Sequence, residues 1–164
     1  PMRDYPLALF MSATLPLATG ATAAEDIVFK TVGEWTVLTQ SDDAITCYAS
    51  RKMEDGSEVQ IGFDLDQKQG FVAIYNAAWT DIKDGDTGTV EFNFGSSRFG
   101  GDAVGKTDNG VPGGYAVFDN PAFVEAFANG QSVKISGSKG VTFDMSLTGT
   151  KNAIIGVRDC QKTK

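Results

Sequence analysis

The sequence predicts a mainly β fold, an antiparallel β-sandwich or flattened barrel with two short helices near the C-terminus. Apolar and polar residues alternate along many short segments, and turn-forming pairs of Gly, Asp and Asn separate these segments. Helical spacing of apolar residues is found in two later segments. The 164 residues contain no long linker or internal repeat, so we expect residues 25–164 to form a single domain with its own core.

The alternation is clearest where Val59, Ile61, Phe63 and Leu65 share one face of a predicted strand. Residues 71–75 are apolar on both faces, which predicts a strand in the middle of the sheet. The full set of expected strands is 27–31, 34–40, 44–52, 58–66, 71–79, 90–94, 113–118, 131–136 and 141–148.

The first helix has start and stop signals. Asn120 can cap its N-terminus, Pro121 suits the first turn, and Gly130 follows as a stop. Phe123 and Phe127 are four residues apart, so both rings should pack on the sheet.

The second helix is expected from about Lys151 to Cys160, with Cys160 on its apolar stripe. Cys47 lies on the same strand face as Ala49, so both sulfurs should point toward the core. The chain has two cysteines, and this even count predicts a disulfide between them if the chain is exported, as the segment described next indicates. Two buried free thiols are the alternative.

Residues 1–24 have the order of a secretion signal. A basic start at Arg3 precedes an apolar run and then small residues, and cleavage fits best after Ala24 or Ala23. The apolar run is shorter than the about 20 residues needed to span a bilayer. We therefore expect a periplasmic or secreted protein with no integral membrane span after signal cleavage; the alternative is a buried N-terminal helix or strand.

The net charge is −7, and the chain has no His. Nucleic-acid binding and docking on anionic lipid both need clustered cations, so neither is expected. The absence of His removes the commonest general base, the Ser-His nucleophile pair and most transition-metal sites. No cofactor or metal is predicted.

Residues 100–107 match the phosphate-loop pattern at every position. The pattern binds phosphates only where a buried strand precedes it and a helix follows it. Here a segment rich in Gly and Pro follows, over residues 108–114, so we expect a glycine-rich turn and no nucleotide site.

An acidic segment contains Asp81, Asp84 and Asp86. It lacks the alternate-residue spacing of a calcium loop, and Lys83 would oppose a cation. We expect these carboxylates to be solvated turn residues.

The aromatic residues Trp35, Trp79, Tyr75 and Tyr115 could form a platform for a sugar or peptide. A role in the core or at its rim is the favoured interpretation, above all for Trp35.

A contact surface is expected in the glycine-rich stretch 96–114, which we interpret as a long loop. Its candidate contact residues are Arg98, Asp102, Lys106 and the adjacent Tyr115.

The order of short motifs along residues 33–160 resembles the invasion-associated locus B family of small exported bacterial proteins. Members usually carry a further cysteine just after the Trp strand, where this chain has Leu38-Thr39-Gln40. The resemblance implies a periplasmic or envelope-associated β-sandwich with no established catalytic residues. The motifs that carry it are Gly33-Glu34-Trp35-Thr36-Val37, Ile45-Thr46-Cys47-Tyr48, Phe118-Asp119-Asn120-Pro121, Gly130, Ser146-Leu147-Thr148-Gly149, Ala153-Ile154 and Cys160.

The sequence therefore favours a non-enzymatic binding protein of the bacterial envelope, whose partner is an envelope or host protein or a glycan. One alternative is a periplasmic glycan or cell-wall hydrolase that uses paired carboxylates. The other alternative is a proteinaceous inhibitor of a hydrolase.

Overall fold

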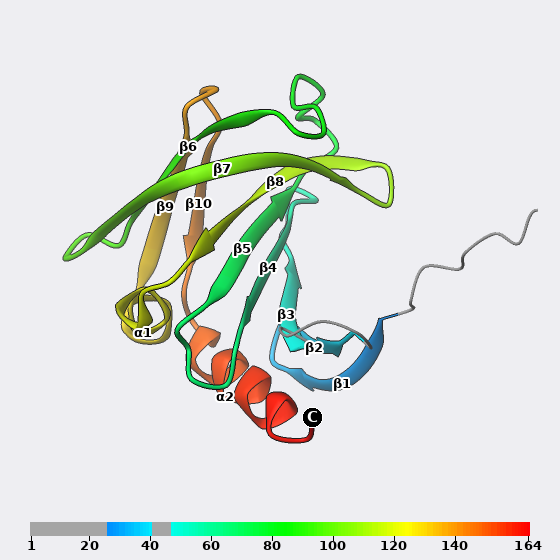
Figure 1. The fold of residues 1–164 in the computed structure, drawn as a ribbon, viewed down its shortest axis with the longest axis vertical. Helices are drawn as coiled ribbons and strands as arrows, with labels where there is room; N and C mark the ends of the chain where they lie inside the picture. Colours follow the sequence, from blue (N-terminus) through cyan, green and yellow to red (C-terminus); the bar gives the residue numbers. More distant parts are fainter. Residues whose placement is uncertain (1–25, 41–46) are drawn as a thin grey trace, which may run out of the picture.

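The fold was analysed in a computed structural model, which describes residues 26–40 and 47–164. The predicted signal at 1–24 and the predicted strand start at 44–46 lie outside the described residues. The described part contains one open antiparallel sheet in the order β1-β2-β3-β4-β5-β8-β7-β6-β9-β10 (Figure 1). The strands are β1 (Ile27–Val32), β2 (Trp35–Thr39), β3 (Cys47–Lys52), β4 (Glu58–Phe63), β5 (Gly70–Tyr75), β6 (Thr87–Asn93), β7 (Arg98–Asp108), β8 (Val111–Phe118), β9 (Ser132–Gly137) and β10 (Thr142–Ser146).

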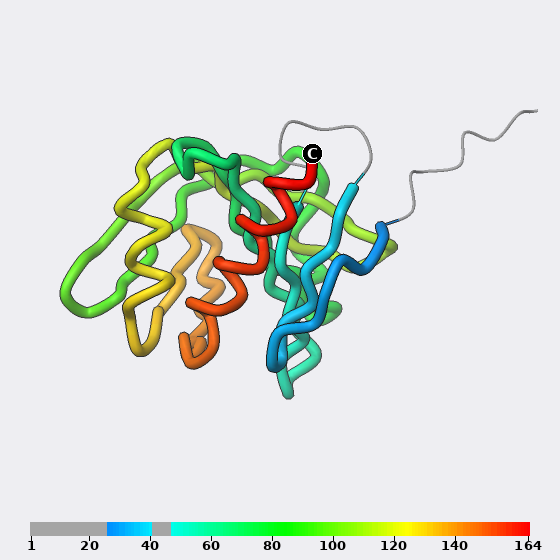
Figure 2. Tube along the Cα trace, turned by 90° about the horizontal axis from the view of Figure 1, so that it is seen from below, coloured from blue at the N-terminus to red at the C-terminus, as the bar shows by residue number. Residues whose placement is uncertain are grey.

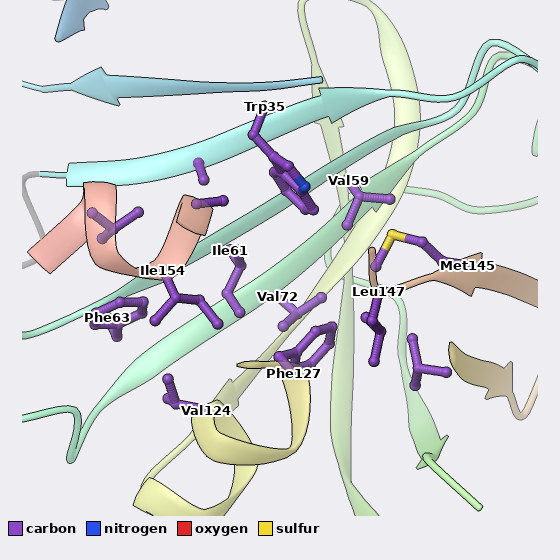
Figure 3. Close-up of a cluster of buried hydrophobic side chains, with 14 of the residues drawn as sticks. Trp35, Val59, Ile61, Phe63, Val72, Val124, Phe127, Met145, Leu147 and Ile154 are labelled. Carbon is purple, nitrogen blue, oxygen red and sulfur yellow. The ribbon is translucent and has the colours of Figure 1, made fainter. Parts of the chain in front are cut away.

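The expected fold class is confirmed: the protein is mainly antiparallel β with two helices near the C-terminus. The sheet is continuous and does not close. It bends so that α1 (Pro121–Asn129) and α2 (Thr150–Gln161) lie on its concave side, with α2 between the two ends of the sheet (Figure 2). Side chains from both halves of the bent sheet meet in one core (Figure 3). The two halves therefore pack face to face, as the two sheets of a β-sandwich do.

The core confirms the predicted inward faces. Trp35 of β2 is 1% exposed, and it belongs to the same buried cluster as Ile61 of β4 and Met145 of β10. The strand expected to be central, β5, pairs with β4 on one side and β8 on the other. Leu65 differs from the prediction, because β4 ends at Phe63 and Leu65 is 50% exposed.

The two helices follow their sequence signals. The Asn120 side chain accepts a hydrogen bond from the Ala122 N–H, Pro121 begins α1, and the Gly130 N–H closes the helix on the Ala126 carbonyl. Phe123 and Phe127 are both buried.

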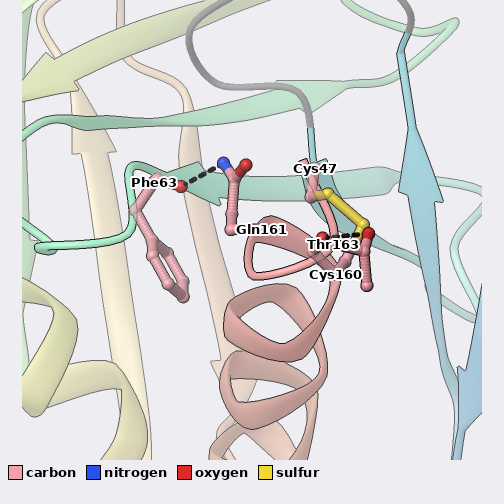
Figure 4. Close-up of a disulfide and its surroundings, with 5 residues drawn as sticks. All are labelled: Cys47, Phe63, Cys160, Gln161 and Thr163. Atoms are coloured by element: carbon pink, nitrogen blue, oxygen red, sulfur yellow. Dashed lines mark hydrogen bonds between the residues drawn. A yellow bond between two sulfur atoms is a disulfide. The ribbon is translucent and has the colours of Figure 1, made fainter.

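The C-terminal helix is attached to the sheet by covalent and polar contacts. Cys160 forms the predicted disulfide with Cys47, across 113 residues of chain (Figure 4). Next to it, the Gln161 side chain donates a hydrogen bond of 2.8 Å to the Phe63 carbonyl at the end of β4. Gly156 lets the helix approach closely, since an added Cβ would lie 3.0 Å from a methyl group of Val37.

The stretch 96–114 was wrongly predicted to be a loop. Its larger part forms β7 and the start of β8, which are joined by a tight turn at Asn109 and Gly110. Both turn residues have positive φ (47° and 82°), as a two-residue hairpin requires. Two other glycines of the stretch serve a different purpose: at Gly105 and Gly113 a Cβ would collide with the backbone of Lys83 and of Ile74, respectively. Glycine therefore allows close chain approach within a sheet here.

The strand expected at 71–79 is also shorter than predicted. β5 ends at Tyr75, because the Asn76 side chain accepts a hydrogen bond from the Ala78 N–H and starts a turn. Trp79 therefore lies in the connection to β6.

The disulfide predicts a specific pattern of stability. Cys47→Ala and Cys160→Ala should each lower the free energy of unfolding by a similar amount, because each breaks the same bond. In the chain-entropy model, a disulfide that closes a loop of this length raises the free energy of unfolding by about 4–5 kcal/mol. The double variant should be little less stable than either single variant, as measured by urea denaturation. Additive losses in the double variant would contradict a shared bond.

Candidate functional site

The concave side of the sheet is filled unevenly. At one end, α1 and α2 supply bulky apolar side chains to the core. At the other end no helix covers the sheet (Figure 1), and a cavity of about 120 Å³ lies between the inner faces of β5, β8, β7, β6, β9 and β10. This cavity is the candidate functional site.

Small residues are frequent in the cavity wall. They are Gly88, Ala103, Gly105, Gly113, Gly114, Ala116 and Gly137, and none has a side chain larger than a methyl group. At Gly105 and Gly113 the space of a side chain is already taken, because a Cβ there would meet the carbonyl oxygens of Lys83 and Ile74.

The remaining wall is predominantly apolar. Val72 and Ile74 of β5 form one side, and Phe143 of β10 lies across from them in the bent sheet. Trp79 and Ile82 come from the connection between β5 and β6. Such a wall favours an apolar ligand, since transfer of apolar surface out of water is favourable and few polar groups would be desolvated.

The connection that carries Trp79 and Ile82 is fixed against β7. The backbones of Gly85 and Asp86 exchange hydrogen bonds with Gly105, and the Asp84 side chain accepts from the Thr107 N–H. The acidic residues of this segment thus fasten a loop to the sheet. Asp84 and Asp86 accept backbone hydrogen bonds, in keeping with the expected turn role.

The charged groups of the cavity wall form one ion pair. Lys139 lies 2.6 Å from Asp86, which also accepts a hydrogen bond from the Lys83 N–H. The hydrogen bond from Lys139, together with the backbone bond, holds the pKa of Asp86 below its ordinary value. Asp86 is the single carboxylate among the wall residues of the described chain.

The predicted contact residues are not brought together. Tyr115 lies in the cavity wall, where β8 faces Val104 of β7. Arg98 is at the start of β7, 3.9 Å from Glu91. Asp102 and Lys106 are exposed on β7.

The aromatic residues lie in the core or at its rim, as favoured for them, and do not form a shared platform. Trp35 lies in the core, Trp79 is partly buried in the cavity wall, and Tyr75 is 4% exposed on β5. Burial raises the pKa of Tyr75 to about 12, and the carboxylates of Asp108 and Glu58 add to the rise.

The phosphate-loop match lies within a strand. Residues 100–107 are all part of β7, and a hairpin turn to β8 follows them. The extended strand offers neither the curved loop nor the helix N-terminus that phosphate binding by this motif requires.

Sequence reasoning missed most of the cavity wall. Ile82 and Asp86 lie in the acidic segment that was interpreted as a turn, and Val90 lies in a predicted strand, but no sequence signal joins them to Lys139, 53 residues after Asp86. The sequence signal that could have indicated the cavity wall was the frequency of Gly and Ala in segments that otherwise have the alternation of strands.

Comparison with solved structures finds a protein of similar fold. No family model matches the sequence, and the search of curated proteins found no significant match. The structure is similar to the crystal structure of invasion associated protein B from Bartonella henselae, with a TM-score of 0.58 and 15% sequence identity. The alignment covers 82% of this chain and 97% of that chain. The two proteins share a fold.

This similarity confirms the fold implied by the sequence resemblance to the invasion-associated locus B family, as a distant relationship at the level of structure. Across residues 26–40 and 47–164, neither helix is long and apolar enough to cross a membrane.

The raised pKa of Tyr75 predicts a loss of stability at alkaline pH. The ordinary pKa is 10.0 and the folded value is about 12, so folding favours the neutral phenol. This contribution is fully present below pH 10 and is lost as the pH rises from 10 through 12. In Tyr75→Phe the decline should be shallower, as measured by urea denaturation across this range.

Ultraviolet titration of tyrosinate provides the direct control for this prediction. Tyr75→Phe should remove a step centred near pH 12. Removal of a step near the ordinary pKa of tyrosine would contradict the burial of this phenol.

Proposed function

We propose that this protein is an exported, periplasmic or envelope-associated binding protein, and that its cavity holds a small apolar group. The observation that carries the proposal is the apolar cavity at the helix-free end of the bent sheet, with a floor of glycines and alanines. An engineered apolar cavity of roughly 150 Å³ accepts benzene, so the present one suits a single ring or a short acyl segment.

Binding is favoured over hydrolysis by the composition of the cavity wall. Glycoside hydrolysis by paired carboxylates needs two acidic groups on either side of the scissile bond. Among the described wall residues the one carboxylate is that of Asp86, and it forms an ion pair with Lys139. We therefore assign the protein no catalytic role.

Export is supported by the order of residues 1–24 and by the Cys47–Cys160 disulfide, since disulfides persist in oxidising compartments. The fold shared with invasion associated protein B of Bartonella henselae is a further support for an envelope role.

Ligand binding can be tested with benzene as the probe. Alternation along β7 places Ala103 on the same face as Phe99, which packs in the core, so Ala103→Phe should fill the cavity. We expect benzene to shift the amide resonances of Ala103 and Gly114 in the unmodified protein, and to cause no shifts in Ala103→Phe. Binding of benzene by Ala103→Phe with unchanged affinity would refute the site.

The matched control adds the same ring one residue away. Asp102 is exposed on the opposite face of β7, so Asp102→Phe should leave benzene binding intact. Loss of binding in both variants would indicate a general disturbance of β7 and would count against the cavity as the site.

Export can be tested by intact mass after expression in a bacterium and fractionation. We expect a periplasmic species that lacks residues 1–24 or 1–23 and resists thiol alkylation before reduction. An uncut cytoplasmic species with two reactive thiols would overturn the assignment of compartment.

A further inference from the structure

The β7–β8 hairpin opens into a wedge. Next to the turn the two strands pair from Asp108↔Val111 to Val104↔Tyr115, and the pairing stops there. Beyond this point β7 continues to Arg98 along β6, whereas β8 continues to Phe118 along β5. Figure 1 shows the two strands diverging toward α1. A cleft of about 350 Å³ lies between them.

An aromatic ring from α1 holds the wedge open. Phe123 is 3% exposed and packs against Phe99 of β7, with 5.2 Å between ring centroids. The same ring packs against Phe118 of β8, at 4.6 Å. One buried side chain thus contacts both diverging strands, so their separation is part of the packed core. These three rings also form an apolar floor for the cleft.

The wedge exposes backbone hydrogen-bonding groups of β7. Residues in an antiparallel strand alternate in the side to which they direct their N–H and C=O. Gly105 directs both groups toward Gly85 and Asp86, on the β6 side. Asp102 and Gly100, at odd offsets from Gly105, therefore direct theirs toward β8, into the wedge.

The edge of β8 across the wedge also directs backbone hydrogen-bonding groups into it. The Pro112 carbonyl accepts a hydrogen bond from the Asn76 N–H on the β5 side, so Val117 directs its N–H and C=O toward β7. In the described part of the chain, neither Val117 nor Gly100 has a strand partner across the wedge. Val117 is 69% exposed, and Gly100 is exposed as well.

Two glycines on the β7 edge are not explained by the fold. A Cβ at Gly101 would have no heavy atom within 4 Å, and one at Gly100 would be 3.7 Å from the Val90 carbonyl, an ordinary contact. Neither glycine has a positive φ. Gly105 and Gly113, by contrast, are required by close backbone approach. Approach of a ligand or of another backbone is one of the reasons for glycine within a strand, and the open edge of β7 leaves room for it.

We propose that the wedge between β7 and β8 is a binding site for an extended peptide segment of a partner protein. The peptide pairs as a strand with the free edge of β7 at Gly100 and Asp102, and places an apolar side chain over Phe99, Phe118 and Phe123. An extended main chain is the occupant that satisfies a row of strand N–H and C=O groups, and this is the basis of recognition by strand addition. The proposal is independent of the apolar ligand proposed for the cavity.

The test starts from a displayed library of random peptides selected on the full chain. The most enriched peptide is synthesised with a fluorescent label, and its Kd is measured by anisotropy for two variants at one position. Gly100→Pro removes the N–H that points into the wedge, at an edge where proline is tolerated. Gly100→Ala keeps this N–H and adds only a methyl group.

We expect Gly100→Ala to bind within about twofold of the unmodified protein, and Gly100→Pro to bind about five- to tenfold more weakly, as the loss of one hydrogen bond predicts. The peptide should also protect the N–H groups of Gly100 and Asp102 from hydrogen exchange. Melting temperatures of both variants should stay close to that of the unmodified protein. If Gly100→Pro fails to fold, Asp102→Pro with Asp102→Ala as control tests the second donor in the same way.

Two results would overturn the proposal. One is that the library yields no peptide enriched on the unmodified protein over the proline variant. The other is a selected peptide that binds the proline and alanine variants equally, or protects N–H groups away from the β7 edge.

Discussion

The packing of the C-terminal helix inside the bend of the sheet is the constraint on which the rest of the structure depends. α2 places Ala153, Val157 and Cys160 against the sheet, and each is fully buried. The disulfide to Cys47 attaches the helix to β3, and the hydrogen bond from Gln161 to the Phe63 carbonyl attaches it to β4. This helix supplies apolar partners to the concave faces of β2 and β3.

Both proposed sites follow from how the helices fill the concave side. The helices occupy one end, so the cavity at the other end is lined by strands and by the connections between them, with Gly and Ala at many wall positions. At the boundary, Phe123 of α1 packs between Phe99 and Phe118 and keeps β7 and β8 apart. Val90, Phe92 and Ala116 border both the cavity and the wedge, so the two sites are neighbours in one inner surface.

The charged groups near the cavity make structural contacts. The chain has no His, and the acidic residues near the cavity fasten the β5–β6 connection to β7 and Lys139. The fold shared with invasion associated protein B occurs here at 15% identity, so the residues that line the cavity and the wedge have to be judged by their own contacts. By those contacts, the cavity is predominantly apolar and lies next to the wedge between β7 and β8.

The sequence by itself determined the elements whose signals are local. Period-two alternation located strands such as β4, β9 and β10 but missed β7. Asn120, Pro121 and Gly130 delimited α1, and the even cysteine count predicted the Cys47–Cys160 bond. Tertiary structure alone decided the role of the glycine-rich stretch. Asn109-Gly110 is a turn signal in the sequence, and both residues have positive φ. Gly100 and Gly105 look alike in sequence, yet one lies on an open edge and the other permits close backbone approach. The physical reason is that a glycine's function depends on what lies where its side chain would be. At Gly105 this space is occupied by the Lys83 backbone, a residue that only folding brings near.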